Sequence, residues 1–315
     1  MSGFFTATTA MRLYTVSGTV QDYAQALDNA AFRAQPTEVA PKEKIVGFVG
    51  LGDPLDTDFL FPLKHEQYVA LSLRIDERKP SMAAVRMRYA EALKKEEEKN
   101  AGKVSRERKK ELKEEILLQV TAKADFVPTL IDCVLDQETN RLIVATASEP
   151  HALLATELFG RVFGVRIEAV QPEEDVSKLF ERIFRETDTL VLPLSNEHVA
   201  TIHSDDYSVT LQSEEGAEER ATVTARASQE AGLKALEQGL FIKRMGIVAE
   251  VRERTQSEDE DPVANCLFTL DDGLLVQGLK MPKHERGNER EDDFYLKIGH
   301  AFQVAEIVEI MGKTA

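Results

Sequence analysis

Cysteine is scarce in this sequence, which has only Cys133 and Cys266 among its 315 residues. Two cysteines cannot build a disulfide scaffold, and their scarcity favours a reducing compartment. The sequence also lacks an apolar run of the roughly 18 residues that a membrane span needs. Residues 1–17 lack the charged start and long apolar block of a signal peptide. We therefore expect a soluble, cytoplasmic protein.

Basic residues are outnumbered, because 39 lysines and arginines face 55 aspartates and glutamates, which gives a net charge of −16. This excess of acid excludes a uniformly basic nucleic-acid coat. It leaves room for a local basic patch on an acidic body, since electrostatic attraction depends on where the charges lie.

Strand and helix patterns are mixed along the chain without a regular β–α–β alternation, so the sequence predicts an α+β fold rather than a doubly wound parallel sheet. Alternating apolar residues predict strands, and apolar residues at helical spacing predict helices. The predicted strands cover 11–16, 44–50, 68–75, 130–135, 141–146, 165–170, 207–212, 221–227, 240–251, 265–270, 274–281 and 293–298. The predicted helices cover 19–32, 82–99, 104–118, 149–163, 176–185, 228–238 and 300–311.

Two of these helices, 82–99 and 104–118, consist of strong helix formers joined near Asn100-Ala-Gly102. Both stretches look too polar to be wholly buried, and we therefore expect an arm that projects from the body. Between Arg86 and Lys113 there are eleven basic and six acidic residues, so this segment carries +5 and the rest of the chain −21.

Four cations of the second helix, Lys103, Arg106, Lys110 and Lys113, are spaced 3, 4 and 3 residues apart. This spacing places them along one side of a helix. A row of cations at that pitch could follow a phosphate backbone without reading bases. A solvated helix with Glu–Lys pairs has the same composition, and this alternative stays open.

No motif identifies a catalytic site. The glycines between Gly47 and Gly52 are followed by Asp53-Pro54 instead of a helix, so they predict a turn beside a strand rather than a phosphate-binding loop. The best metal candidates are His198 and His203, with two aspartates at 205 and 206 nearby, but the sequence favours a surface loop over a metal site there.

Lys243 and Arg244 lie inside the apolar strand predicted at 240–251. Adjacent residues of a strand point to opposite faces, so at most one of the two faces the core. The side chain of the other could line a concave surface, or it could lie on an ordinary exposed face of the strand.

The segment from Asn100 to Leu118 resembles the basic arm of the recombination-associated RdgC proteins. The resemblance continues without gaps through the predicted hairpin and the helix ending at Gly164. Further stretches occur in the family's order at Ala31-Phe32, Gly47–Val49, Arg74–Val85, Glu237–Gly239, Asp271–Gly273, Leu279-Lys280 and Asp293–Gly299.

This resemblance implies a horseshoe-shaped α+β subunit with mixed sheets and a projecting two-helix arm, which closes as a ring-shaped homodimer. It implies sequence-independent binding of double-stranded DNA in a positively charged hole, and modulation of recombination by restricting access of the RecA recombinase. It also implies association with the nucleoid, no enzymatic activity, no cofactor, no metal and no membrane. Whether single-stranded DNA also binds is left open.

The resemblance divides the chain into an N-terminal part of a central body (1–76), an arm and tip domain with the basic helices and hairpin (77–171), and a C-terminal base domain (172–315). Where the family has a phenylalanine that helps to close the ring, this chain has Asp125, and Phe126 is the predicted replacement at the dimer interface. The predicted DNA contacts are Lys103, Arg106, Lys109, Lys110, Lys113 and Lys123 from the arm and Arg226, Lys243 and Arg244 from the body.

Two other functions remain open from the residues alone. One is a metal-dependent nuclease that cleaves the bound DNA, which would need acidic side chains to converge in space. The other is a protein-interaction module, in which the polar helices bind a partner protein and the basic row is only solvated.

Overall fold

The computed structural model describes residues 3–19, 23–33, 40, 43–59, 64–99, 103–186, 189–195, 197–213, 222–225, 229–256, 260–283 and 290–314. In this part of the chain, seven helices accompany a sheet of thirteen strands whose strand pairs are antiparallel. The α+β class predicted from the sequence is confirmed.

The sheet has two halves that share the first strand, β1 (Thr8–Ser17). Residues Thr8–Met11 of β1 pair with the C-terminal half, and its later residues pair with the N-terminal half. The N-terminal half contains β2 (Ile45–Val49), β3 (Lys64–His65), β4 (Tyr68–Arg78), β5 (Phe126–Asp136), β6 (Arg141–Val144) and β7 (Arg166–Ala169). The C-terminal half contains β8 (Leu190–Pro193), β9 (His198–Gln212), β10 (Thr222–Ala225), β11 (Phe241–Glu253), β12 (Ala264–Asp271) and β13 (Val276–Lys280).

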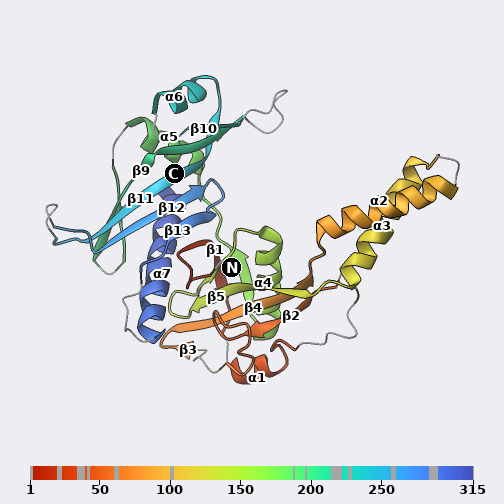
Figure 1. Ribbon diagram of the computed structural model, residues 1–315. Coiled ribbons are helices and arrows are strands. Elements are labelled where there is room, and N and C mark those ends of the chain that lie inside the picture. The colour runs from red at the N-terminus through yellow and green to blue at the C-terminus, as the bar shows by residue number, and fades with distance from the viewer. Residues whose placement is uncertain are drawn as a thin grey trace.

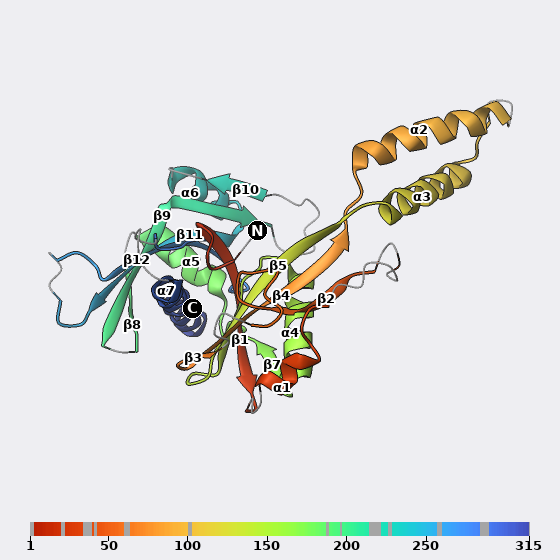
Figure 2. The same ribbon diagram turned by 60° about the horizontal axis from the view of Figure 1, so that its bottom comes forward.

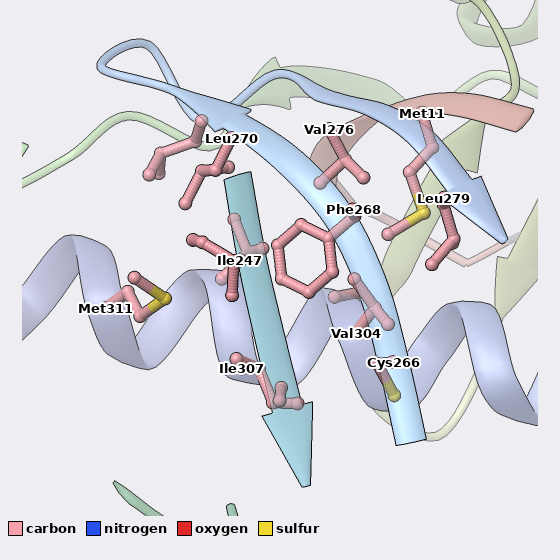
Figure 3. Packing of buried hydrophobic residues seen from close by; sticks show 14 of the residues in the cluster. Met11, Ile247, Cys266, Phe268, Leu270, Val276, Leu279, Val304, Ile307 and Met311 are labelled. Atoms are coloured by element: carbon pink, nitrogen blue, oxygen red, sulfur yellow. The ribbon is translucent and has the colours of Figure 1, made fainter. Parts of the chain in front are cut away.

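Each half has its own apolar core. In the C-terminal half, helices α5 (Val176–Glu186) and α7 (Arg290–Thr314) pack against the sheet. Ile247 and Phe268 of the sheet and Ile307 of α7 belong to the apolar core between the sheet and α7 (Figure 3). In the N-terminal half, α1 (Tyr23–Asp28) and α4 (Glu149–Phe163) cover one face of the sheet. The short helix α6 (Gln229–Glu237) lies beside β9 and β10. Burial of these apolar faces is the main favourable contribution to folding.

Helices α2 (Met82–Lys99) and α3 (Arg106–Ala122) lie side by side and extend away from both halves of the sheet (Figures 1 and 2). They have a small core of their own, formed by Val85, Ile116 and Val120. The chain enters α2 from β4 and leaves α3 into β5, so the pair is attached to the body through two adjacent strands. We call these two helices the helical pair.

The N-terminal boundary of α3 is set by its cap. Ser105 has an extended backbone, and its hydroxyl oxygen accepts a hydrogen bond from the backbone N–H of Arg108 at 3.1 Å. Such a bond satisfies one of the free N–H groups in the first helical turn. At the end of α4, Gly164 adopts the left-handed conformation with φ of 67°, as expected for a C-terminal glycine.

One predicted strand, 293–298, is wrong, because these residues form the first part of α7. Phe-Tyr-Leu-Lys-Ile alternates locally like a strand, but the buried residues Phe294, Ile298, Ala301 and Ala305 continue at helical spacing into the predicted helix 300–311. The first helix is also shorter than predicted, since α1 covers only Tyr23–Asp28.

The residues from Gly47 to Gly52 form the strand end and turn that the sequence predicts. Gly47 lies in β2 against the backbone of Phe32, where a side chain would collide. The N–H of Gly50 donates to the carbonyl oxygen of Asp56 at 2.7 Å, which closes the following turn. Close backbone approach, and not phosphate binding, accounts for the glycine at 47.

A buried carboxylate anchors the N-terminal residues to the sheet. Asp132 of β5 accepts hydrogen bonds from the backbone N–H of Phe4 at 3.0 Å and from the Ser72 hydroxyl at 2.5 Å. Gly3 lies so close to Asp132 that a side chain would collide with the carboxylate. Burial raises the pKa of Asp132, while its two hydrogen bonds lower that pKa in part.

The raised pKa of Asp132 predicts a pH-dependent contribution to stability. Because the folded protein binds this proton more tightly than the unfolded chain does, the free energy of unfolding should fall as the pH rises from the unfolded pKa of about 3.9. Asp132→Asn removes this titration, so its free energy of unfolding should decline less with rising pH than that of the wild type. Urea unfolding at several pH values from about 4 to 7 measures the difference.

The exposed carboxyl of Asp125 offers the control for this experiment. Asp125→Asn should follow the wild-type pH dependence. A constant difference in unfolding free energy between Asp132→Asn and the wild type at every pH would contradict the prediction.

Among the helices that the structure describes, none combines the length and the apolar character needed to cross a membrane.

Candidate nucleic-acid interface

Arg108 of α3 joins the two helices of the helical pair. Its Nε lies 3.0 Å from a carboxylate oxygen of Glu96 on α2, and its Nη1 lies 3.1 Å from Glu111 and 3.0 Å from Glu115. These three carboxylates raise the pKa of Arg108. The guanidinium therefore links α2 to α3 and neutralises acidic side chains.

A second ion pair crosses between the helices, from Lys109 to Glu97 at 4.0 Å. Consecutive helical residues are rotated by about 100° around the axis, so Lys109 and Arg108 point to different sides of the contact between the helices. The same holds for Glu97 and Glu96 on α2. The helical pair therefore has two distinct flanks, which we call the Lys109 side and the Arg108 side.

The Lys109 side of α3 carries three further cations, Arg106, Lys110 and Lys113. All three are exposed, and none forms an ion pair with a residue that the structure describes. Lys103, which precedes the helix, is likewise exposed and without such a partner. The prediction that these four residues lie along one side is therefore compatible with the structure, whereas Lys109 is half-buried and paired.

The acidic residues of α3 lie elsewhere on its surface. Glu111 and Glu115 follow Arg108 by three and seven residues, which places them on the Arg108 side, where they bind it. Glu107 and Glu114 point away from α2 at this helical spacing. They also border Lys110, since Glu107 precedes it by three residues and Glu114 follows it by four. The Lys109 side of α3 thus keeps a positive charge, because four cations are bordered by only two carboxylates.

Lys123 and Phe126 lie at the attached end of the helical pair. Lys123 is the exposed C-cap residue of α3, and Phe126 begins β5. The guanidinium of Arg78 stacks 4.4 Å above the Phe126 ring and donates to the carbonyl oxygens of Ala122 and Ala124, both at 2.9 Å. Phe126 is therefore half-buried at the base of the pair, and its role in a dimer interface stays a prediction.

The predicted contacts from the body are not brought next to the helical pair. Lys243 and Arg244 lie on β11, in the other half of the sheet (Figures 1 and 2). Lys243 Nζ lies 2.6 Å from a carboxylate oxygen of Asp272, so its charge is already compensated. Arg244 is half-buried, opposite Thr210 and Asp271 on the neighbouring strands. Arg226 lies outside the described residues.

The cysteines and histidines form no recognisable catalytic centre in the described part of the chain. Burial raises the pKa of the Cys133 thiol and raises that of Cys266 to about 12, which disfavours the reactive thiolate. Among the described residues, no group of three or more His, Cys, Asp or Glu side chains could hold a metal ion. His198 and His203 belong to no such group, and they lie in strand β9, so the surface loop that the sequence favours at these residues is wrong.

An α+β body, with an external pair of helices whose cations lack ion-pair partners among the described residues, defines a protein suited to bind a polyanion along its surface. Residues 4–182 match the family model described as "Putative exonuclease, RdgC", and the chain belongs to the RdgC family. Membership of this family indicates a DNA-associated function related to recombination. No curated protein matches the chain.

Proposed function

We propose that this protein binds double-stranded DNA without sequence preference, as a ring-shaped homodimer whose arms are the helical pairs. In the cell it would associate with the nucleoid and modulate recombination by restricting the access of RecA to DNA. The observation that carries the DNA-binding part is the row of exposed cations on the Lys109 side. The ring and the antagonism with RecA rest on the resemblance to the family.

The chemistry of the arm supports binding to phosphates and not to bases. Flexible lysine and arginine side chains on one side of a helix can neutralise phosphates and release counterions, and such contacts carry no sequence information. Arg106, Lys110 and Lys113 span about 10 Å along α3, at 1.5 Å per residue. The row is thus long enough to contact successive phosphates of one strand.

The charge of the rest of the chain directs DNA to the arm. Outside residues 86–113 the chain carries −21, which repels a polyanion from most of the body. In the proposed ring, a second copy supplies a second arm, so two basic elements would face the same duplex while the acidic surfaces stay outside.

The proposal is tested by fluorescence anisotropy of labelled duplexes titrated with the protein at several salt concentrations. We expect saturable binding with equal affinity for unrelated sequences and a steep linear fall of log affinity with log salt. Absence of binding at low salt, together with a specific protein partner that is captured instead, would favour the interaction module.

The family description favours a second candidate, an exonuclease. The experiment is incubation of end-labelled duplex with the protein and Mg²⁺ or Mn²⁺, and we expect the label to stay in full-length DNA. Release of labelled nucleotides that EDTA abolishes would overturn the non-enzymatic proposal, because hydrolysis by a two-metal mechanism requires the cation.

A further inference from the structure

The relative rotation of α2 and α3 is fixed by the two ion pairs that cross between them. Arg108 contacts Glu96 on one flank of the contact, and Lys109 contacts Glu97 on the other. The apolar residues Val85, Ile116 and Val120 lie between these flanks. Cations of α2 can therefore be assigned to the same flank as the α3 row or to the opposite flank.

Arg86 and Lys94 share the flank of Glu97. They precede it by eleven and three residues, which corresponds to about 20° and 60° of rotation around the α2 axis. Both are exposed, and neither forms an ion pair with a described residue. The ion pair between Glu97 and Lys109 and the packing of Val85 against Ile116 and Val120 set the level of each residue along the two helices. Lys94 is thus level with Lys110 and Lys113 on the outer part of this flank, whereas Arg86 lies nearer the body than the α3 row.

Arg88, Lys95 and Lys99 belong to the other flank. They lie between about 60° and 100° from Glu96 and away from Glu97. They too are exposed, but on their flank α3 presents the carboxylates of Glu111 and Glu115. An approaching phosphate would meet both signs of charge there.

The two flanks differ in net charge. The Lys109 side carries six cations and three carboxylates, a net charge of +3, from Arg86, Lys94, Arg106, Lys109, Lys110, Lys113, Glu97, Glu107 and Glu114. The Arg108 side carries four cations and four carboxylates, a net charge of 0, from Arg88, Lys95, Lys99, Arg108, Glu91, Glu96, Glu111 and Glu115. Glu98 lies on the outside of α2, within four residues of both Lys94 and Lys95.

We infer that the DNA-binding surface of the arm is the whole Lys109 side, to which α2 contributes Arg86 and Lys94. This inference rests on the proposed function. Packed helices lie about 8–10 Å apart, so these two cations extend the surface from α3 across to α2 and towards the body. The sequence counts these two residues among the basic ones of the arm but does not distinguish them from their neighbours.

The test compares two double variants that remove the same charges from the same helix. Arg86→Gln with Lys94→Gln removes one arginine and one lysine from the Lys109 side. Arg88→Gln with Lys95→Gln removes one of each from the Arg108 side. Glutamine has nearly the same helix propensity as lysine and arginine, so both variants should keep the helices, which circular dichroism checks.

We expect the first variant to bind a random-sequence duplex about 60-fold more weakly at 0.1 M salt, with a log–log salt slope smaller by about 1.8, since each lost phosphate contact contributes about 0.9. The second variant should lose less than about threefold, because a charge that makes no contact acts only through the screened field. Equal losses in both variants would overturn the assignment.

Failure of this inference can be distinguished from failure of the proposed function. Suppose neither α2 variant weakens binding, but neutralising the α3 cations does. The arm then binds DNA through α3 alone, and the contribution of α2 to the surface is wrong. If neutralising α3 is also without effect, the arm is not the DNA-binding element.

Discussion

Replacing Lys103, Arg106, Lys110 and Lys113 together with glutamine should weaken duplex binding about 4,000-fold at 0.1 M salt. Each phosphate contact contributes about 0.9 to the slope of log affinity against log salt, which is about eightfold in affinity at this concentration. Four contacts would therefore also reduce the slope by about 3.6. Anisotropy titrations at several salt concentrations measure both quantities, and the loss should be the same for unrelated duplex sequences.

A matched control removes four lysines from the exposed surface of the body. Lys178, Lys234, Lys283 and Lys313 are exposed and far apart in the chain, and their replacement by glutamine changes the net charge equally. This control should leave the salt slope unchanged. If both quadruple variants lose affinity to the same extent, net charge and not the arm governs binding.

Phe4→Ala should lower the free energy of unfolding by about 3–5 kcal/mol, the usual cost of removing a buried aromatic side chain. Phe4 is fully buried in the core of the C-terminal half, although its backbone N–H is bonded to Asp132 in the N-terminal half. The substitution leaves a cavity where both halves meet. Urea unfolding measures the change in free energy.

Phe5 is the control for this prediction, because it is the neighbouring aromatic residue but is only half-buried. Phe5→Ala should cost clearly less than Phe4→Ala. A loss below about 1 kcal/mol for Phe4→Ala would show that the N-terminal residues add little to the core. Both variants should still bind DNA at temperatures where they are folded, since neither residue lies on the helical pair.

Local sequence patterns predict those parts of the fold whose signals are themselves local. The helices 82–99 and 149–163 match α2 and α4 because strong helix formers, a proline near the first turn of α4 and Gly164 mark their extents. The prediction of a strand at 293–298 is wrong, because five residues alternate locally like a strand although the longer segment has a helical period. Short strands such as β3 and β8 carry too few residues for any pattern to be visible.

The candidate site could be predicted only in part for a related reason. The row on α3 follows from spacing within one helix, whereas the partners of Arg108 and Lys109 depend on how α2 is rotated against α3. As long as the rotation of α2 against α3 is unknown, Lys109 counts as a free cation, and Arg86 cannot be distinguished from Arg88. The domain boundaries near residues 76 and 171 and the closure of a ring stay predictions.

The shared strand β1 determines when the protein can finish folding during its synthesis. Thr8 pairs with Lys280, so the partners of the first strand are made about 270 residues later. A nascent chain that ends near residue 182 already contains β1, β6 and β7, but one edge of β1 is still open. The buried face of α5, with Val176 and Phe180, also waits for β11 and α7. We therefore expect the two halves to lock together only after α7 has left the ribosome, so that during most of the synthesis β1 keeps one edge unpaired.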